Sequence, residues 1–392
     1  MPITSNFLMQ GGRLVATNLE IAISAELPEV TGRAAMCLPF ALVKRFLQHV
    51  SDTEVLDITV KGYKTTIKAG RMTSVVQGSN PKDFPSLTEI SEEGEQSLDG
   101  DRLIRSLISA MPATSTETAR PVLQGVCLTF GTPAKVAAGD GYRLMWQDAV
   151  GLNVVAPGEN ELYVIIPKTS ISALDTLWRK AIKVPSTNGH IFSQLNPPTL
   201  EAVGMAVSKR ILKVRFNMSD NKMAFDVGEA TLTTQLIAGE FPDFSALIPE
   251  DQGHQVTFDA AEAFRVVRML SGMASEGNNI VRARWYEDYI EFSAKGESVG
   301  EMSQSMPASI KGDPSNIAFN AKYLLEYFSG KEGLILMETS SVSSPARFTH
   351  GRSANLVLMP MFVEWGDEPA SDEADRPATT RPRARRGHKP AK

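Results

Sequence analysis

The sequence predicts an α+β protein built from three similar domains. The same order of strands and helices recurs three times along the chain, and a length of 392 residues suits two or three domains. A hydrophobic content of 42% with 22% charged residues is typical of a chain that can bury large cores. A repeat of this size indicates duplicated domains, which build shapes more often than single active sites.

Each repeat contains an apolar strand, a second strand that runs into polar residues, a strand followed by a helix, a hairpin and a closing segment. In the first third these segments are Ser5–Gln10, Arg13–Ile23, Met36–Val50, Asp57–Gln77 and Phe84-Pro85. In the second third they are Pro121–Phe130, Lys135–Trp146, Leu162–Ala181, Leu212–Ile237 and Phe241-Pro242. In the last third they are Ile280–Tyr286, Tyr289–Ser293, Ile317–Ser329, Leu334–Phe348 and Leu356–Met361. We therefore expect domains at residues 1–93, 94–244 and 245–365.

Four segments carry apolar residues at helical spacing, namely Phe40–Val50, Leu98–Met111, Ile171–Lys180 and Ala260–Met273. Acidic residues near the start of two of them suit the positive end of a helix dipole. The polar faces of these helices are mostly basic, with Lys44, Arg45, Arg102, Arg105, Arg179, Lys180, Arg265 and Arg268. A common surface that faces an anion explains this pattern, and ordinary solvated helix faces explain it equally well.

Charge is distributed unevenly along the chain. The segment from Arg376 to Lys392 holds seven Lys and Arg and no acidic residue, which leaves 33 basic and 45 acidic residues elsewhere, a net charge of −12. Residues 366–392 lack apolar periodicity, so we expect a disordered tail that either contacts nucleic acid or serves only solubility. The acidic body argues against a protein that coats DNA with a positive surface.

Repeat spacing locates an insertion in the second domain. Asn18 and Asp140 are 122 residues apart and Pro39 and Pro167 are 128 apart, whereas Phe84 and Phe241 are 157 apart. About 29 extra residues therefore enter the second repeat. The segment 182–210, with its Pro and Asn-Gly turn signals, is the best candidate for a surface loop.

A search for reactive groups finds no established motif. The histidines are scattered, none at metal-ligand spacing, and phosphate-loop, nucleophile-elbow and zinc-protease patterns are all missing from the sequence. Gly139-Asp140-Gly141 and Ser343-Ser344 are interpreted as turns. Cys37 and Cys127 lie in apolar runs and are expected to be buried thiols, which favours a reducing cytoplasm. No run of residues is long and apolar enough for a membrane span or a signal peptide. We therefore expect no cofactor, no metal and no membrane segment, and the missing motifs lower the expectation of an enzyme without excluding one.

Five motifs, in order, carry a family resemblance. They are Arg120-Pro121-Val122-Leu123-Gln124-Gly125-Val126, Asp140-Gly141-Tyr142-Arg143-Leu144, Ile166-Pro167-Lys168, Gly239-Glu240-Phe241-Pro242-Asp243-Phe244 and Val357-Leu358-Met359-Pro360-Met361. Together they resemble the bacterial sliding clamp, the β subunit of DNA polymerase III, from about Ile3 to Phe362. Ala16-Thr17-Asn18-Leu19-Glu20 and Lys82-Asp83-Phe84-Pro85 are similar to the matching signatures of the family's first domain.

The resemblance implies the DNA clamp fold, with outer β-sheets, inner helices and two chains closed head to tail into a ring around duplex DNA. It implies a non-catalytic homodimer that confers processivity and binds the DNA polymerase III catalytic subunit and the clamp loader through short peptides. The basic helix residues given above would face DNA. Val76, Met269 and Leu270, taken to be exposed, match the family's subunit contact.

By motif, the peptide pocket of the family falls on Leu123, Gly141, Tyr142, Arg143, Leu144, Pro242, Leu247, Ser344, Val357 and Met359. Apolar walls, an adaptable Met and orienting polar groups suit a peptide ligand, although Leu123 and Leu144 are also explained as core strand residues. The chain departs from the family at Gly139, Tyr142 and Ala246, where Thr, His and a polar residue are usual, so partner preference is expected to differ.

Two larger departures concern the ends of the sequence. The chain begins where the second strand of the family begins, so we expect the first strand and first inner helix of domain one to be absent. The basic tail after Phe362 is additional. A mis-set start codon would explain the first departure. An origin on a plasmid or in a phage would explain both departures.

Two other classes of function stay open. One is a regulator or recombination factor that grips DNA directly through its basic helices, which would show a steep salt dependence of binding. The other is a hydrolase with an unrecognised site.

Overall fold

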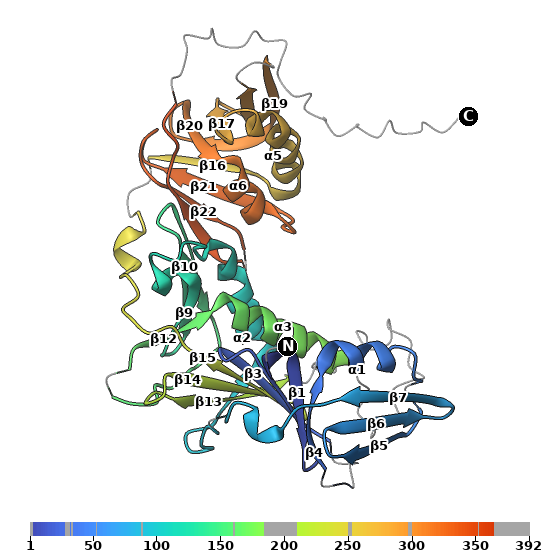
Figure 1. Ribbon diagram of the computed structural model, residues 1–392. Coiled ribbons are helices and arrows are strands. Elements are labelled where there is room, and N and C mark those ends of the chain that lie inside the picture. The colour runs from blue at the N-terminus through green and yellow to red at the C-terminus, as the bar shows by residue number, and fades with distance from the viewer. Residues whose placement is uncertain are drawn as a thin grey trace, which may run out of the picture. The chain divides into compact units, whose positions relative to one another are not determined.

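The computed structural model describes residues 3–27, 32, 34–51, 53–87, 89–159, 161–183, 210–249, 253–296, 300–351 and 353–363. The predicted tail and all but the ends of the predicted insertion lie outside these residues. The chain divides into two compact units, one from residues 1–136 and 148–241 and the other from residues 137–147 and 242–392. Figure 1 shows the chain coloured from the N-terminus to the C-terminus and labels many of its helices and strands.

The described elements follow one order three times. The first set is β1 (Asn6–Gln10), β2 (Arg13–Thr17), β3 (Ile21–Glu26), β4 (Ala35–Pro39), α1 (Phe40–Leu47), β5 (Leu56–Lys61), β6 (Lys64–Ala69) and β7 (Met72–Gln77). The second set is β8 (Gln96–Asp99), α2 (Gly100–Ala110), β9 (Gly125–Thr129), β10 (Ala134–Gly139), β11 (Arg143–Ala149), β12 (Tyr163–Pro167), α3 (Lys168–Lys183), β13 (Ile211–Asn217), β14 (Lys222–Val227) and β15 (Ala230–Gln235).

The third set is β16 (His254–Asp259), α5 (Ala260–Ser275), β17 (Ile280–Trp285), β18 (Tyr289–Gly296), β19 (Gly300–Lys311), β20 (Ser315–Asn320), α6 (Ala321–Phe328), β21 (Leu334–Thr339), β22 (Ala346–Thr349) and β23 (Asn355–Leu358). A strand and a helix, β8 with α2 and β16 with α5, open the second and third sets. In the first set, the described residues begin with a 3-10 turn, Ile3–Ser5, which leads directly into β1. Strand β1 corresponds in the repeat to β9 of the second set and β17 of the third.

In the first unit, an eight-stranded sheet has the order β4-β1-β2-β3-β15-β14-β13-β8, and β5-β6-β7 form a separate three-stranded sheet. Strand β3 pairs with β15 along Ala25↔Ala230 to Ile21↔Thr234. The first two predicted domains therefore share a sheet, and most of both lies in the first unit, while residues 137–147 of the second predicted domain belong to the second unit. The predicted boundaries near residues 93 and 244 stay predictions.

Helix α2 begins later than the sequence pattern suggested. Leu98, assigned to the apolar face of this helix, lies instead in β8, because the carboxylate of Asp99 caps the helix by accepting from the N–H of Arg102 at 3.1 Å. Asp101 then ties the helix start to α3, since Trp178 Nε1 donates to it at 2.9 Å. Hydrogen bonding from Arg210, first among the causes, lowers the pKa of the Asp101 carboxyl.

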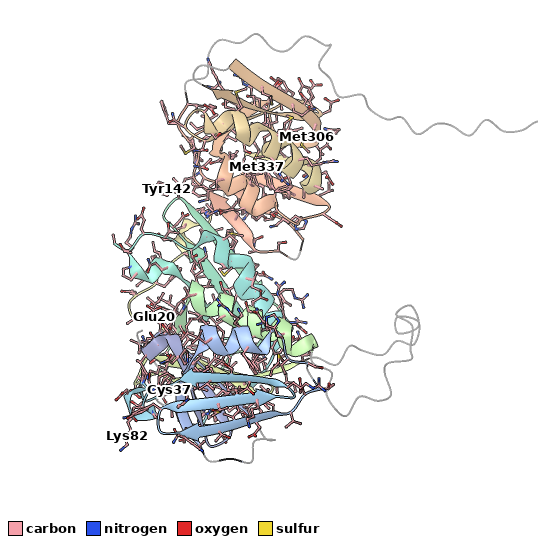
Figure 2. The ribbon with its side chains drawn as sticks, turned by 45° about the vertical axis from the view of Figure 1, so that its right-hand side comes forward. Glu20, Cys37, Lys82, Tyr142, Met306 and Met337 are labelled. Atoms are coloured by element: carbon pink, nitrogen blue, oxygen red, sulfur yellow. The ribbon has the colours of Figure 1, made fainter. Side chains whose placement is uncertain are left out.

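In the second unit, strands are hydrogen-bonded in the order β11-β23-β22-β21-β16-β19-β18-β17-β20. Helix α5 packs along β17, β18 and β19 and against α6. Phe258 in β16 meets Phe292 in β18 and Phe328 at the end of α6 edge to face, at ring-centre distances of 6.0 and 5.9 Å. Figure 2 shows the dense side-chain packing of this unit around Met306 and Met337. Cys37 and Cys127 are buried free thiols, as predicted.

Candidate functional site

The antiparallel pair β11–β23 brings five of the predicted pocket residues together within the second unit, namely Tyr142, Arg143, Leu144, Val357 and Met359. Leu144 pairs with Val357, and two residues along the ladder the N–H of Met359 donates to the carbonyl of Tyr142 at 2.9 Å. Leu144 and Val357 are buried, whereas Tyr142 and Met359 are 58% and 45% exposed. The end of this ladder therefore presents an aromatic ring and a flexible thioether to solvent, which is a suitable surface for apolar anchors of a peptide.

A tight turn positions Tyr142. The carboxylate of Asp140 accepts from the N–H groups of Tyr142 at 2.9 Å and Arg143 at 3.0 Å, and Gly141 adopts a φ of 95°, which favours glycine. The prediction that Gly139-Asp140-Gly141 forms a turn is thus confirmed. The same carboxylate both closes the turn and aligns the first residues of β11.

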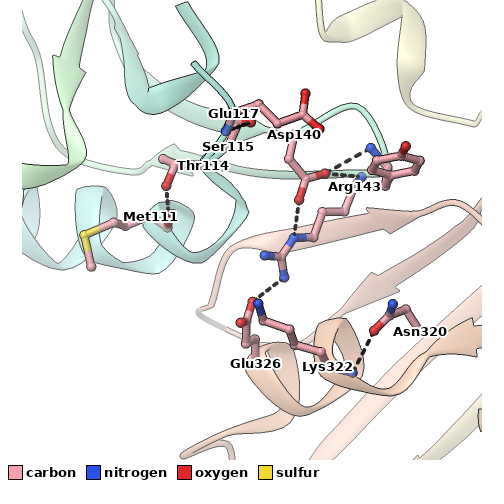
Figure 3. A network of polar contacts seen from close by, with 10 residues as sticks. Met111, Thr114, Ser115, Glu117, Asp140, Arg143, Asn320, Lys322 and Glu326 are labelled. Atoms are coloured by element: carbon pink, nitrogen blue, oxygen red, sulfur yellow. Dashed lines mark hydrogen bonds and ion pairs between the residues drawn. The ribbon is translucent and has the colours of Figure 1, made fainter. Parts of the chain in front are cut away.

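Arg143 links this turn to helix α6, as Figure 3 shows. Its Nε donates to Asp140 Oδ2 at 3.0 Å, its Nη1 donates to Glu326 Oε2 at 2.5 Å, and its guanidinium lies 4.2 Å from the ring centre of Tyr323. Only 6% of the Arg143 side chain is exposed. A guanidinium held this way positions the turn, because its donors face two carboxylates and an aromatic ring of the same unit.

Sequence reasoning missed Tyr323 and Glu326, the partners of Arg143 on α6. The two residues are three positions apart on a helix and so occupy one face, a signal that was available once the helix was predicted. Burial, first among the causes, raises the pKa of the Tyr323 phenol, and the nearby negative charge of Asp140 raises it further. Tyr323 therefore stays protonated and able to donate at the edge of the site.

The other predicted pocket residues do not join this ladder. Leu123 belongs to the first unit, where it is buried in the 3-10 turn Pro121–Gln124. Pro242 and Leu247 are exposed in the segment that opens the second unit, with Leu247 at the end of a 3-10 turn. Ser344 lies in the turn between β21 and β22, with its hydroxyl 2.7 Å from that of Ser341. Their shared role in a pocket stays a prediction.

The basic helix residues differ in how far they are already neutralised. Arg102 donates to the carbonyl of Val150 and forms an ion pair with Asp99 at 3.5 Å. Arg179 Nε donates to the carboxylate of Asp175 at 2.8 Å. Arg105 is exposed but donates to the carbonyl of Asp101. The remaining five are exposed and form no ion pair with another described residue: Lys44, Arg45, Lys180, Arg265 and Arg268. The charge that these helices offer to an anion is therefore smaller than the sequence count suggested.

The predicted subunit contact needs a correction. Met269 is 46% exposed, but Val76 and Leu270 are 3% and 0% exposed within the single chain. Strand alternation turns Val76 inward and Val75 outward. On α5, Leu270 lies on the buried face with Val266 and Val267, and its neighbour Met269 faces outward. Of the three predicted contact residues, Met269 alone offers substantial surface to a second chain.

Two other kinds of feature, a metal-binding cluster and a membrane-spanning helix, are not found among the described residues. No group of His, Cys, Asp and Glu side chains in this part of the chain is arranged to hold a metal ion. Among the same residues, no helix combines the length and the hydropathy that crossing a membrane requires.

The chain is similar to known proteins in family, in sequence and in fold. Residues 245–360 match the family described as the DNA polymerase III beta subunit, C-terminal domain. A beta sliding clamp of Chlamydia pneumoniae is 26% identical over 377 residues, which covers 92% of this chain and 92% of that protein. A beta sliding clamp of Staphylococcus aureus is 22% identical over 325 residues, covering 80% of this chain and 78% of that protein.

Solved structures agree with these relationships. A sliding clamp from Pseudomonas aeruginosa bound to griselimycin is 20% identical with a TM-score of 0.76, covering 93% of this chain and 92% of that one. The DNA polymerase III beta subunit from Thermotoga maritima is 18% identical with a TM-score of 0.75, again over 93% and 92% of the two chains. At these identities the structural likeness establishes the fold.

Proposed function

We propose that this chain, a divergent relative of the bacterial beta sliding clamps along most of its length, is itself a DNA sliding clamp that tethers a polymerase to DNA. The observation that carries the proposal is a sequence relationship over 92% of the chain to a beta sliding clamp, on a structure with the same fold. A clamp works by topology and by docking partners, so it needs no catalytic group. The chain would serve as the processivity subunit of a replicative polymerase.

The charge distribution supports retention on DNA by topology rather than by adhesion. Outside the basic segment 376–392 the chain carries a net charge of −12, and five exposed helix cations without an ion partner among the described residues are few for a direct grip on the phosphate backbone. In a closed ring, weak sequence-independent contacts from these helices suffice, because escape requires an opened interface or a DNA end. We infer a head-to-tail homodimer around duplex DNA.

The β11–β23 ladder supports a role in docking. Exposed Tyr142, on a turn held by the buried Arg143, and exposed Met359, hydrogen-bonded to Tyr142, offer a preorganised apolar surface for a short peptide. We infer that the catalytic subunit of DNA polymerase III and the clamp loader bind here through such peptides. Tyr142, where the family usually has His, would shift the preference among them.

A retention experiment tests the proposal. Protein loaded on nicked circular DNA is washed with salt between about 50 and 200 mM, a range in which six to ten phosphate contacts would lose on the order of 10³–10⁵ in affinity. We expect the circular DNA to retain the protein through the wash and linearisation to release it. Matched linear DNA is the control. Equal retention on both forms, with a steep loss on both as salt rises, would instead identify a direct DNA-binding protein.

A further inference from the structure

The methionines of the second unit differ widely in exposure. Met145, Met306 and Met337 are 2%, 0% and 1% exposed, so they belong to the core. Met359, directly after β23, is 45% exposed. A thioether reacts with a peroxide that can reach it, so exposure decides which of these methionines is oxidised first.

The backbone of Met359 is fixed although its side chain is exposed. Arg143 pairs with Leu358 in the β11–β23 ladder, and the N–H of the next residue, Met359, donates to the carbonyl of Tyr142 at 2.9 Å. Met359 and Tyr142 are therefore opposite each other, and side chains at opposite positions lie on one face with Cβ atoms about 5 Å apart. The thioether thus lies beside the exposed Tyr142 side chain, and a change in its chemistry leaves the ladder hydrogen bond in place.

Oxidation of the Met359 thioether would make this apolar surface polar. Hydrogen peroxide transfers one oxygen atom to the sulfur: an S–O bond forms, the O–O bond breaks, the sulfur is oxidised by two electrons and the peroxide is reduced to water. The resulting sulfoxide is polar, and burying a polar group without a hydrogen-bond partner is costly. An apolar peptide anchor that packs against the thioether would therefore bind less well against the sulfoxide.

We propose that Met359 is a modification site, at which oxidation by hydrogen peroxide reversibly weakens the binding of partner peptides. This inference rests on the proposed docking function of the β11–β23 ladder. Methionine sulfoxide reductases return each sulfoxide epimer to the thioether. A dithiol supplies the two electrons and becomes a disulfide, and the oxygen leaves as water. Docking would thus be restored without synthesis of new protein.

Two other methionines among the described residues have a similar exposure. Met269 on α5 is 46% exposed and Met302 on β19 is 37% exposed. Peroxide is expected to oxidise them as well, but neither is part of the β11–β23 ladder. The oxidation of Met359 alone should therefore change peptide binding, so Met302 provides a comparison within the same unit.

The probe is a fluorescent peptide from the catalytic subunit of a DNA polymerase III, titrated into the full chain before and after peroxide treatment and followed by anisotropy. Mass spectrometry of the digested chain measures the oxidation of each methionine. We expect Met359 to be oxidised while Met145, Met306 and Met337 stay reduced, and the affinity to fall at least about tenfold. Methionine sulfoxide reductases with dithiothreitol should restore the affinity.

Two variants assign the effect to one sulfur atom. Met359→Leu has no thioether at this position, so its own starting affinity should survive the treatment. Met302→Leu is the matched control, because it makes the same change at an exposed site outside the ladder, and it should lose affinity as the natural chain does. Circular dichroism checks that the treated proteins stay folded.

The possible failures are distinguishable. If the untreated chain does not bind the peptide, the proposed docking function is wrong and this inference fails with it. If the untreated chain binds, three results would overturn this inference alone: unchanged affinity after complete oxidation of Met359, an equal loss of affinity in the treated Met359→Leu variant, or oxidation of Met359 no faster than that of the buried methionines.

Discussion

Arg143 is the residue on which the candidate docking surface depends. Its guanidinium, 6% exposed, is neutralised by Asp140 and Glu326, and a buried cation that loses one partner is costly. We expect Glu326→Gln to weaken binding of a clamp-binding peptide by about three- to tenfold, because the weaker neutral hydrogen bond loosens the turn that carries Tyr142. Fluorescence anisotropy measures the change. Glu301→Gln, at an exposed position on β19, is the control, and equal affinities for the two variants would refute a positioning role for Arg143.

Lys331 gives the second unit a pH dependence of its own. Burial lowers the pKa of its ammonium group to about 8, and Nζ lies 4.1 Å from the ring centre of Tyr327. In the unfolded chain a lysine titrates near 10.4, so between about pH 8 and that value the unfolded state binds more protons. The free energy of unfolding should therefore rise with pH across this window, by on the order of 1–3 kcal/mol.

Chemical denaturation at several pH values tests this assignment. The change is the replacement Lys331→Met, which keeps the length of the side chain and removes the titrating group. The variant should show a flatter dependence of unfolding free energy on pH than the natural chain. Parallel curves for the two proteins would show that Lys331 titrates normally in the folded state.

Residue identities predicted the turn at Gly139-Asp140-Gly141 and the buried thiols, because glycine at positive φ and apolar runs are local signals. They did not predict the partners of Arg143, since Glu326 lies 183 residues away in sequence. Exposure of Val76 and Leu270 was also wrongly expected. Val76 points inward because side chains alternate along a strand, and Leu270 does so because of its position around the helix. A match to a family motif gives neither of these directions.

At the scale of elements, the β11–β23 pair contains both buried and exposed residues, so substitutions of its buried residues test folding and substitutions of its exposed residues test peptide docking. Leu144 is buried opposite Val357, so Leu144→Ala would leave a cavity at a cost of about 2–5 kcal/mol. Met359 is 45% exposed on the same ladder. We expect Met359→Ala to lower the affinity for a clamp-binding peptide by about tenfold while the thermal unfolding midpoint changes little. A loss of affinity that only accompanies a loss of stability would argue against a direct contact.

Element order was the most accurate part of the sequence prediction, because apolar periodicity and turn residues are local. The least accurate part was the boundary between strand and helix at Leu98, where a single capping carboxylate decides the start of α2. The joining of two predicted domains through β3 and β15 involves pairing between residues about 210 positions apart, and no local pattern encodes such a pairing.

At the scale of the whole molecule, the exposure of individual residues on α5 shows which substitutions can test whether two chains assemble. We expect the natural chain to be a dimer at micromolar concentration and Met269→Asp to produce folded monomers, because Met269 is 46% exposed on α5 and a charge there would have to be buried at a subunit contact. Leu270→Asp should behave differently, since Leu270 is 0% exposed and a buried aspartate would destabilise the fold itself. Light scattering gives the mass and circular dichroism the folded fraction of each variant. If the natural chain is monomeric, or if the Met269→Asp variant stays dimeric, α5 is not part of the proposed ring contact. If the Met269→Asp variant is monomeric and fully folded, Met269 lies within that contact.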